Sequence, residues 1–179
     1  MSCWTSAVQS AFSNVTRAAC IGGILGALAM GAPLRVQAAD WCSGGIWIDA
    51  MIGSYHVHPK QSFEDVNPGL GAECWLNDRW AVTAGGYRNS LSRPSWYAGG
   101  VWSPEFLHWG IVRLAAMGGI ISGYNYGQWG IGANHTIGPV AAPILMVEYK
   151  RVGANFIVVP PIPSDNLPFT IGFQVKARF

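Results

Sequence analysis

The sequence predicts an all-β fold, an eight-stranded antiparallel transmembrane β-barrel preceded by a signal peptide. Three observations predict it: an apolar leader, a closing segment in which apolar and polar side chains alternate, and a regular rhythm of long and short connections. The 179 residues suit one domain. Only 11% of them are charged, whereas soluble domains carry about 25%. This deficit favours contact with lipid.

The leader has the features of a secretory signal peptide. Arg17 precedes the small and apolar run 18–32, and Val36-Gln37-Ala38 is a small-residue cleavage pattern. We therefore expect a signal peptide over 1–38, cut to within a residue or two, and a barrel over 39–179. Removing the leader leaves nine basic and nine acidic residues. The mature chain is then about neutral, and nothing indicates a nucleic-acid partner.

Two cysteines remain in the mature chain, and the sequence leaves their state open. Cys42 precedes the first predicted strand and Cys74 lies in the second. An even pair in an oxidising compartment can form a disulfide. Two separate thiols facing lipid or core are equally compatible with the sequence.

Eight segments of the mature chain read as strands, and long connections follow the odd-numbered ones. In the first, Ile46 and Ile48 share one face while Asp49 lies on the other, which fits a lumen. Tight turns are expected at Asn77-Asp78, at 103–105 and at 150–153. An even strand number with this loop asymmetry is typical of a bacterial outer-membrane barrel with both termini periplasmic. The predicted strands are 46–56, 69–76, 80–87, 95–102, 109–124, 139–149, 154–159 and 169–179.

The final segment, 169–179, alternates cleanly. One face carries Phe169, Ile171, Phe173, Val175, Ala177 and Phe179, and the other Thr170, Gly172, Gln174, Lys176 and Arg178. An apolar face on a terminal strand needs cover, which lipid supplies in a transmembrane barrel. The alternative is the last strand of a soluble sandwich. The terminal aromatic carboxylate also resembles the signal read by the barrel-insertion machinery.

Two features exceed what a plain barrel requires. The fifth to seventh strands are apolar on both faces, so that part of the lumen holds either a small apolar ligand or a solid core. In addition, Pro139, Pro143 and Pro160 each remove a ladder donor. The gap could admit a lipid chain sideways. Alternatively, the prolines mark strand ends near the rim, which suits Pro160 better than Pro143.

Several of these segments, in this order, resemble the PagP family of lipid A palmitoyltransferases over most of the mature chain. The family's enzyme is an eight-stranded barrel that moves a palmitoyl chain from a phospholipid to lipid A. The matching residues are 67–73 (NPGLGAE), Tyr87-Arg88-Asn89-Ser90, Ala98-Gly99, Trp102, Pro139-Val140-Ala141-Ala142-Pro143, Val147-Glu148-Tyr149, Val158-Val159-Pro160 and Phe179.

The resemblance implies catalytic roles for three residues at the outer rim. The family's His corresponds to His56, with His58 as the runner-up, and its Ser to Ser90. Asn89 stands where the family has Asp. An Asn cannot carry the charge that stabilises an imidazolium, although it can donate a hydrogen bond to an oxyanion.

Three residues close to the Asn89-Ser90 pair are candidates for substrate contacts. Tyr87, Arg88 and Arg93 are candidates for binding substrate, the arginines through lipid A phosphates. Val101 stands where the family has the glycine that floors its acyl pocket, so we expect a shorter pocket.

We therefore expect an outer-membrane lipid A acyltransferase-like barrel, with a non-catalytic barrel that stabilises the envelope or binds lipid as the alternative. The implied partners are phospholipid, lipopolysaccharide, the outer membrane and the barrel-insertion machinery, and the protein is expected to be a monomer. No cofactor is expected. His56 and His58 lack a third ligand at suitable spacing, so no metal site is expected.

Overall fold

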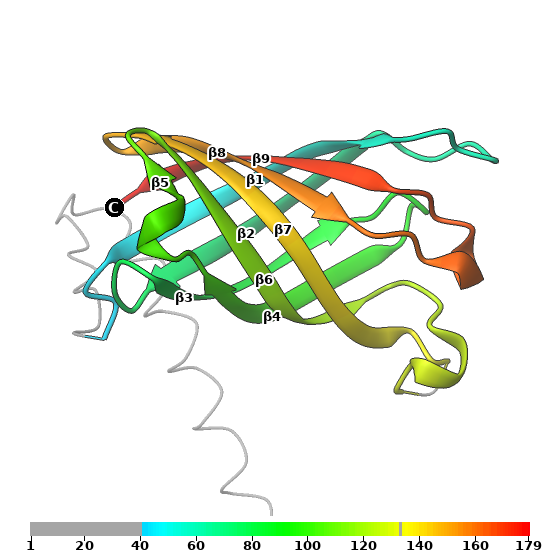
Figure 1. Cartoon of the computed structure of the whole chain (residues 1–179). Coiled ribbons are helices and arrows are strands. Elements are labelled where there is room, and N and C mark those ends of the chain that lie inside the picture. Colours follow the sequence, from blue (N-terminus) through cyan, green and yellow to red (C-terminus); the bar gives the residue numbers. More distant parts are fainter. Residues whose placement is uncertain (1–40, 133) are drawn as a thin grey trace, which may run out of the picture. The chain divides into compact units, whose positions relative to one another are not determined.

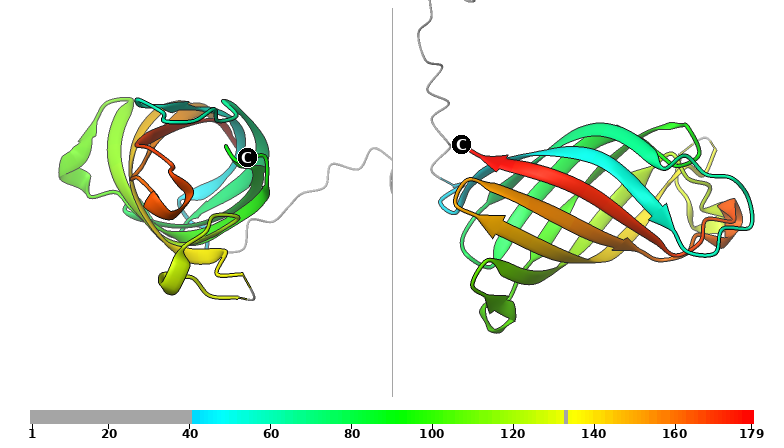
Figure 2. Two further views of the ribbon diagram at one scale, coloured as in Figure 1. Left: turned by 90° about the vertical axis from the view of Figure 1, so that its right-hand side faces the viewer. Right: turned by 90° about the horizontal axis from the view of Figure 1, so that it is seen from above.

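The computed structural model describes residues 41–132 and 134–179, which form an all-β, closed, eight-stranded antiparallel barrel (Figure 1). The wall runs in the order β4-β3-β2-β1-β9-β8-β7-β6 and closes by pairing β4 with β6. Figure 2 shows the closed ring end-on. The strands are β1 (Gly45–His56), β2 (Val66–Trp75), β3 (Trp80–Arg88), β4 (Pro94–Trp102), β5 (His108–Trp109), β6 (Val112–Ser122), β7 (Ile137–Tyr149), β8 (Val152–Val159) and β9 (Thr170–Arg178).

The predicted eight-stranded barrel is thus confirmed, and short β5 lies outside the wall. Three 3-10 turns complete the structure: η1 (Glu105–Leu107), η2 (Gly127–Trp129) and η3 (Pro163–Asp165). No helix among the described residues is long and apolar enough to cross a membrane. The predicted signal peptide lies outside the described residues.

The closing strand behaves as its alternation predicts. β9 pairs with β1 on one side and β8 on the other. Gln174 and Lys176 are buried in the lumen, whereas Val175 is half exposed on the outer surface. The same rule holds in β1, where Asp49 is buried and Ile48 faces outward. Successive side chains point to opposite faces of a strand, so the polar face lines the lumen.

The connection between β4 and β6 is not the predicted tight turn. Residues 103–111 form an arm that contains η1 and β5, and the chain reverses at Gly110 (φ 61°). The fully buried Ser103 hydroxyl donates to the Leu114 carbonyl at 2.9 Å and lies 2.8 Å from His108 Nε2. These contacts hold a connection that is longer than the predicted turn at 103–105. As a result, β6 begins at Val112 and not at the predicted residue 109.

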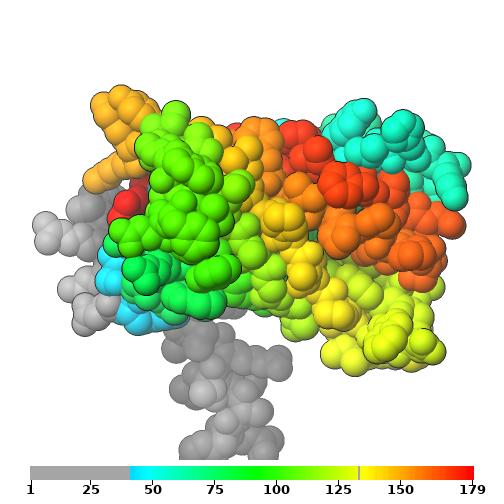
Figure 3. Space-filling view, viewed as in Figure 1, coloured from blue at the N-terminus to red at the C-terminus, as the bar shows by residue number. Residues whose placement is uncertain are grey.

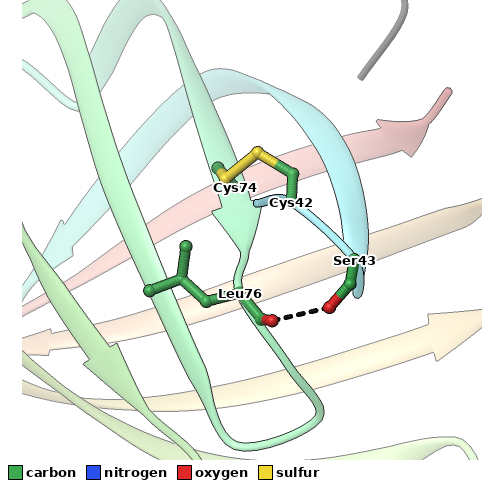
Figure 4. The surroundings of a disulfide bond; sticks show 4 residues. All are labelled: Cys42, Ser43, Cys74 and Leu76. Atoms are coloured by element: carbon green, nitrogen blue, oxygen red, sulfur yellow. Dashed lines mark hydrogen bonds between the residues drawn. A yellow bond between two sulfur atoms is a disulfide. The ribbon is translucent and has the colours of Figure 1, made fainter. Parts of the chain in front are cut away.

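A disulfide joins Cys42 to Cys74 (Figure 4), which resolves the alternatives that the sequence left open. The ladder sets Gly45 opposite Trp75. The Gly44 N–H donates to the Trp75 carbonyl at 2.8 Å, and the Ser43 hydroxyl donates to the Leu76 carbonyl at 2.7 Å. The segment before β1 is therefore fastened along the end of β2, and the two Cα atoms come within 5.3 Å.

Large and charged side chains fill much of the lumen at the end that holds the C-terminus. We call this part the plug: Trp47, Glu73, Trp75, Arg113, Met146, Glu148, Asn155 and Lys176. Lys176 Nζ lies 2.9 Å from Glu73 Oε2 and 2.7 Å from Glu148 Oε1. Arg113 Nη2 binds Glu148 at 2.9 Å, and its guanidinium carbon lies 3.9 Å from the Trp75 ring centre. Charge pairing allows these ionic groups to stay buried.

Candidate functional site

The opposite half of the lumen contains a cavity of about 80 Å³. Its lining is mainly apolar, as the two-faced apolar strands indicated, and includes Met117, Ile121, Val140, Ala142, Ile157 and Val159. Gly172 lies on the inward face of β9 and leaves room there. The glycine pairs Gly85-Gly86, Gly99-Gly100 and Gly118-Gly119 do not line the cavity, although Gly85 packs against the ring of Tyr97. The cavity lies near the loops that follow β1, β3, β6 and β8.

Tyr97 separates the cavity from the plug. Its hydroxyl accepts a hydrogen bond from Gln174 Nε2 at 3.3 Å, and both residues line the cavity. The ring lies against two glycines: a Cβ at Gly85 would come within 2.7 Å of the Tyr97 hydroxyl, and one at Gly71 would collide with it. Val101, the residue expected to shorten the pocket, is fully buried in the same core cluster as Tyr97 but does not itself line the cavity, whereas Tyr97 does.

One part of the wall beside the cavity has no ladder. β7 pairs with β6 along residues 137–147, but its pairing with β8 stops at Ile144 opposite Ile157. We call this unpaired stretch between residues 137–143 of β7 and 158–159 of β8 the seam. Val140, Ala142 and Val159 on its two sides line the cavity.

Two of the three predicted prolines lie in the seam. The Glu148 N–H donates to the Ile111 carbonyl at 2.7 Å, toward β6. Because N–H direction alternates along a strand, Pro139 and Pro143 occupy positions whose N–H would point away from β6, toward the seam. They remove donors that would otherwise have no ladder acceptor, as on an edge strand. Pro160 directly follows the last residue of β8, in agreement with the alternative that it marks a strand end.

His56 is the predicted site residue with the most informative surroundings. Its buried ring stacks on Phe63 at 4.7 Å, and Nδ1 lies 3.1 Å from Asp65 Oδ1. Nε2 is buried and has no hydrogen-bond partner among the described residues. A carboxylate on Nδ1 orients an imidazole and leaves Nε2 as the basic nitrogen. His58, the runner-up, is exposed in the loop.

Ser90 reaches the same region through Ser54. Ser54 precedes His56 by two residues on the inward face of β1, and its hydroxyl lies 3.2 Å from that of Ser90. The Ser54 hydroxyl donates to Asn67 Oδ1 at 2.5 Å, so Ser90 is the donor between the two serines. Ser54, Asn67 and Ser90 all line the cavity.

Asn89 is completely occupied in holding its loop. Its Nδ2 donates to the Ser95 hydroxyl at 2.9 Å and to the Gly123 carbonyl at 3.0 Å, while its Oδ1 accepts from the Leu91 and Arg93 N–H groups. Both amide hydrogens and both lone-pair directions are therefore used. The predicted role of Asn89 as an oxyanion donor would require one of these bonds to break.

The predicted substrate-binding residues separate into two groups. Tyr87 lines the cavity, and its hydroxyl lies 3.1 Å from that of Tyr124. Burial raises the pKa of Tyr124, which therefore stays a neutral phenol. Arg88 is exposed at the C-terminal end of β3, and Arg93 Nη1 lies 3.7 Å from Asp165 in the loop after β8.

Sequence reasoning missed Asp65, Ser54 and Asn67. Ser54 and His56 at i, i+2 were a readable signal, because they share one face of the first strand. Asp65 gave none, since the contact depends on how the loop after β1 folds back. Among the described residues, no group of three or more His, Cys, Asp or Glu could hold a metal ion.

The fold and the site thus define an eight-stranded barrel with a cavity in one half of its lumen. Comparison of the chain with protein-family models finds no family that matches, and comparison with curated proteins finds no match either.

Proposed function

We propose that this protein is an outer-membrane barrel that takes up a phospholipid acyl chain and transfers it to lipid A at the outer leaflet. One observation carries the proposal: the apolar cavity is lined both by residues on the two sides of the seam and by the hydroxyl groups of Ser54 and Ser90, with the buried His56 two residues beyond Ser54 in β1. Outward-facing apolar residues on the wall, among them Ile48, Leu70, Ile120 and Val175, support a lipid environment.

The seam supports sideways entry of the acyl chain. At about 80 Å³ the cavity is smaller than the 150 Å³ or so that accommodates benzene, so a long chain requires the wall to part. Parting β7 from β8 beyond Ile144 breaks no ladder hydrogen bond. The cost is limited to the apolar contacts across the seam.

The side chains near the cavity fit an acyl transfer. His56 Nε2 takes the proton from a lipid A hydroxyl, and that oxygen attacks the ester carbonyl carbon of the phospholipid. Ser90 turns its proton from Ser54 to the developing oxyanion, an interaction worth about 2.7–4 kcal/mol for a good donor. The bond to the glycerol oxygen then breaks, and the imidazolium returns its proton to that oxygen. Lysophospholipid and acylated lipid A are released.

Mass spectrometry of lipid A from cells with and without the protein tests this proposal. Wild-type protein should add one acyl chain, and His56→Ala should abolish it. Asp65→Asn should reduce the addition without abolishing it, because Asp65 only orients the ring. His58→Ala is the matched control and should change nothing. All variants should keep the shift in gel mobility between unboiled and boiled samples. Unmodified lipid A in wild-type cells, or activity in His56→Ala, would contradict the assignment.

A non-catalytic lipid-binding barrel is the second candidate, and Asn89 favours it. The residue at the family's Asp position has no charge, and its amide is committed to the loop. In that case the purified protein should retain a phospholipid labelled in its acyl chain, while lipid A keeps its original mass.

A further inference from the structure

The arm, residues 103–111, has large apolar side chains that remain exposed and are not packed into the barrel. The exposed fractions of Phe106, Trp109 and Ile111 are 74%, 55% and 51%. Trp80 and Trp102 adjoin them on the wall, with ring centres 6.2 Å apart. The arm projects sideways from the wall at the end that holds the C-terminus (Figure 2), and its surface is continuous with the wall in Figure 3.

The arm is held in this position by specific hydrogen bonds. Ser103 is fully buried and binds both Leu114 and His108, and its N–H donates to the Arg79 carbonyl at 2.8 Å. The Ile111 carbonyl accepts from Glu148. Fixing a loop costs conformational entropy, and here the fixed loop holds large apolar side chains away from the core. A contiguous exposed patch of this kind indicates an interaction surface.

We propose that the arm docks in the headgroup zone of the lipid bilayer at the end of the barrel that holds the C-terminus. This inference rests on the membrane location in the proposed function. Exposed apolar side chains also lie where the arm joins β4 and β6, namely Trp102 and Leu114. Trp side chains favour the membrane interface because their rings are apolar and their N–H is polar.

The charges beside the patch fit a zwitterionic phospholipid. Arg79 and Glu105 form an exposed ion pair at 2.9 Å and line a groove together with Trp102 and Phe106. The guanidinium matches a headgroup phosphate, and the carboxylate matches a headgroup ammonium. Because the ion pair and the aromatic rings line the same groove, one phospholipid can place its headgroup on the charges and its acyl chains on the rings.

Depth-dependent quenching tests the proposal. An environment-sensitive fluorescent amino acid is placed at position 106 and, as the control, at Lys60 in the loop after β1. Each folded chain is inserted into phosphatidylethanolamine vesicles whose acyl chains are brominated near the ester. The probe at 106 should be quenched several-fold more strongly by the lipid than the probe at 60, and should be shielded from aqueous iodide.

The other outcomes either contradict docking of the arm in lipid or distinguish this docking from the proposed acyl transfer. Equal access of iodide to both probes would overturn docking in lipid. Shielding at 106 that requires a high protein-to-lipid ratio and accompanies cross-linked dimers would assign the patch to a second copy, and overturn it too. Chains that fail to float with vesicles would overturn both this inference and the proposed function. Quenching at 106 with unmodified lipid A in cells would support the arm and refute only the acyl transfer.

Discussion

The two halves of the lumen are enclosed by the same eight strands and yet differ in filling, charge and wall pairing. The plug is filled by Trp47, Trp75 and Met146, whereas small residues such as Ala142 and Gly172 leave the cavity open in the other half. Strand number sets the width of a barrel. Side-chain size along each inward face then decides whether that width is filled.

The halves also differ in electrostatics and in the wall around them. The plug buries Lys176 with two carboxylates, so each charge depends on its partners. The polar residues that line the cavity, among them Ser54, Asn67 and Ser90, are uncharged. Around the plug, β7 is paired on both sides, whereas the cavity wall contains the seam. We infer that the plug gives the barrel its stability and that the cavity half is free to open.

The largest expected effect comes from breaking the plug's charge pairing. Lys176→Met leaves Glu73 and Glu148 buried together without their shared cation. Removing one partner of a buried ion pair costs about 3–5 kcal/mol, so the denaturant midpoint of unfolding should fall steeply. Adding Glu73→Gln to Lys176→Met should recover part of the loss. A single substitution that leaves the midpoint unchanged would show that the plug does not stabilise the barrel.

Reducing the disulfide should produce the next largest loss. Cys42 and Cys74 are 32 residues apart, and closing a loop of that length restricts the unfolded chain by about 3–4 kcal/mol. The denaturant midpoint of unfolding, compared with and without reductant, measures this loss of stability. The double variant Cys42→Ser/Cys74→Ser should show no difference between the two conditions. Because the bond fastens the plug end, ligand retention in the cavity should not change. A loss of retention would mean that the two halves are coupled.

Substitution of Asp49 should change stability by a smaller amount and in the opposite direction, because it should stabilise the fold. Its side chain is buried, its residue pairs across the ladder with Lys176, and neither carboxylate oxygen has a hydrogen-bond partner among the described residues. An unpaired buried charge is unfavourable, so Asp49→Asn should raise the free energy of unfolding by about 1 kcal/mol. Glu73→Gln, which breaks paired contacts, should lower it. A fall in both variants would place Asp49 within the plug's pairing after all.

The smallest expected stability effect is the sharpest test of the cavity. Gly172 lines it, and an added Cβ would lie in ordinary contact with Ile157. Gly172→Ala should raise stability by about 0.5–1 kcal/mol, because glycine loses more entropy in a strand, and should reduce acyl-chain binding. Gly100→Ala has similar room on the outward face and is the matched control. Equal binding in both variants would mean that the acyl chain does not enter the cavity.

Much of the fold follows from the sequence because strand periodicity is local. The alternation in 169–179 and the face shared by Ile46 and Ile48 decided which side chains point inward before any partner strand was known. Glycine, proline and polar runs marked most connections. The exception, 103–111, depended on Ser103 reaching Leu114 and His108, contacts that no local pattern encodes.

The site and the lumen were decided by tertiary structure. The family resemblance indicated His56 and Ser90, but the Asp65 contact, the Ser54–Ser90 pair and the full occupation of Asn89 arise where separate loops meet. The same is true of the seam, because a proline shows that a donor is missing and does not show which neighbour it would have faced. The Cys42–Cys74 bond likewise required the register of β1 against β2. The sequence of a strand determines whether each side chain points into the lumen or outward. The strands across the lumen determine how much space that side chain has and which groups it contacts.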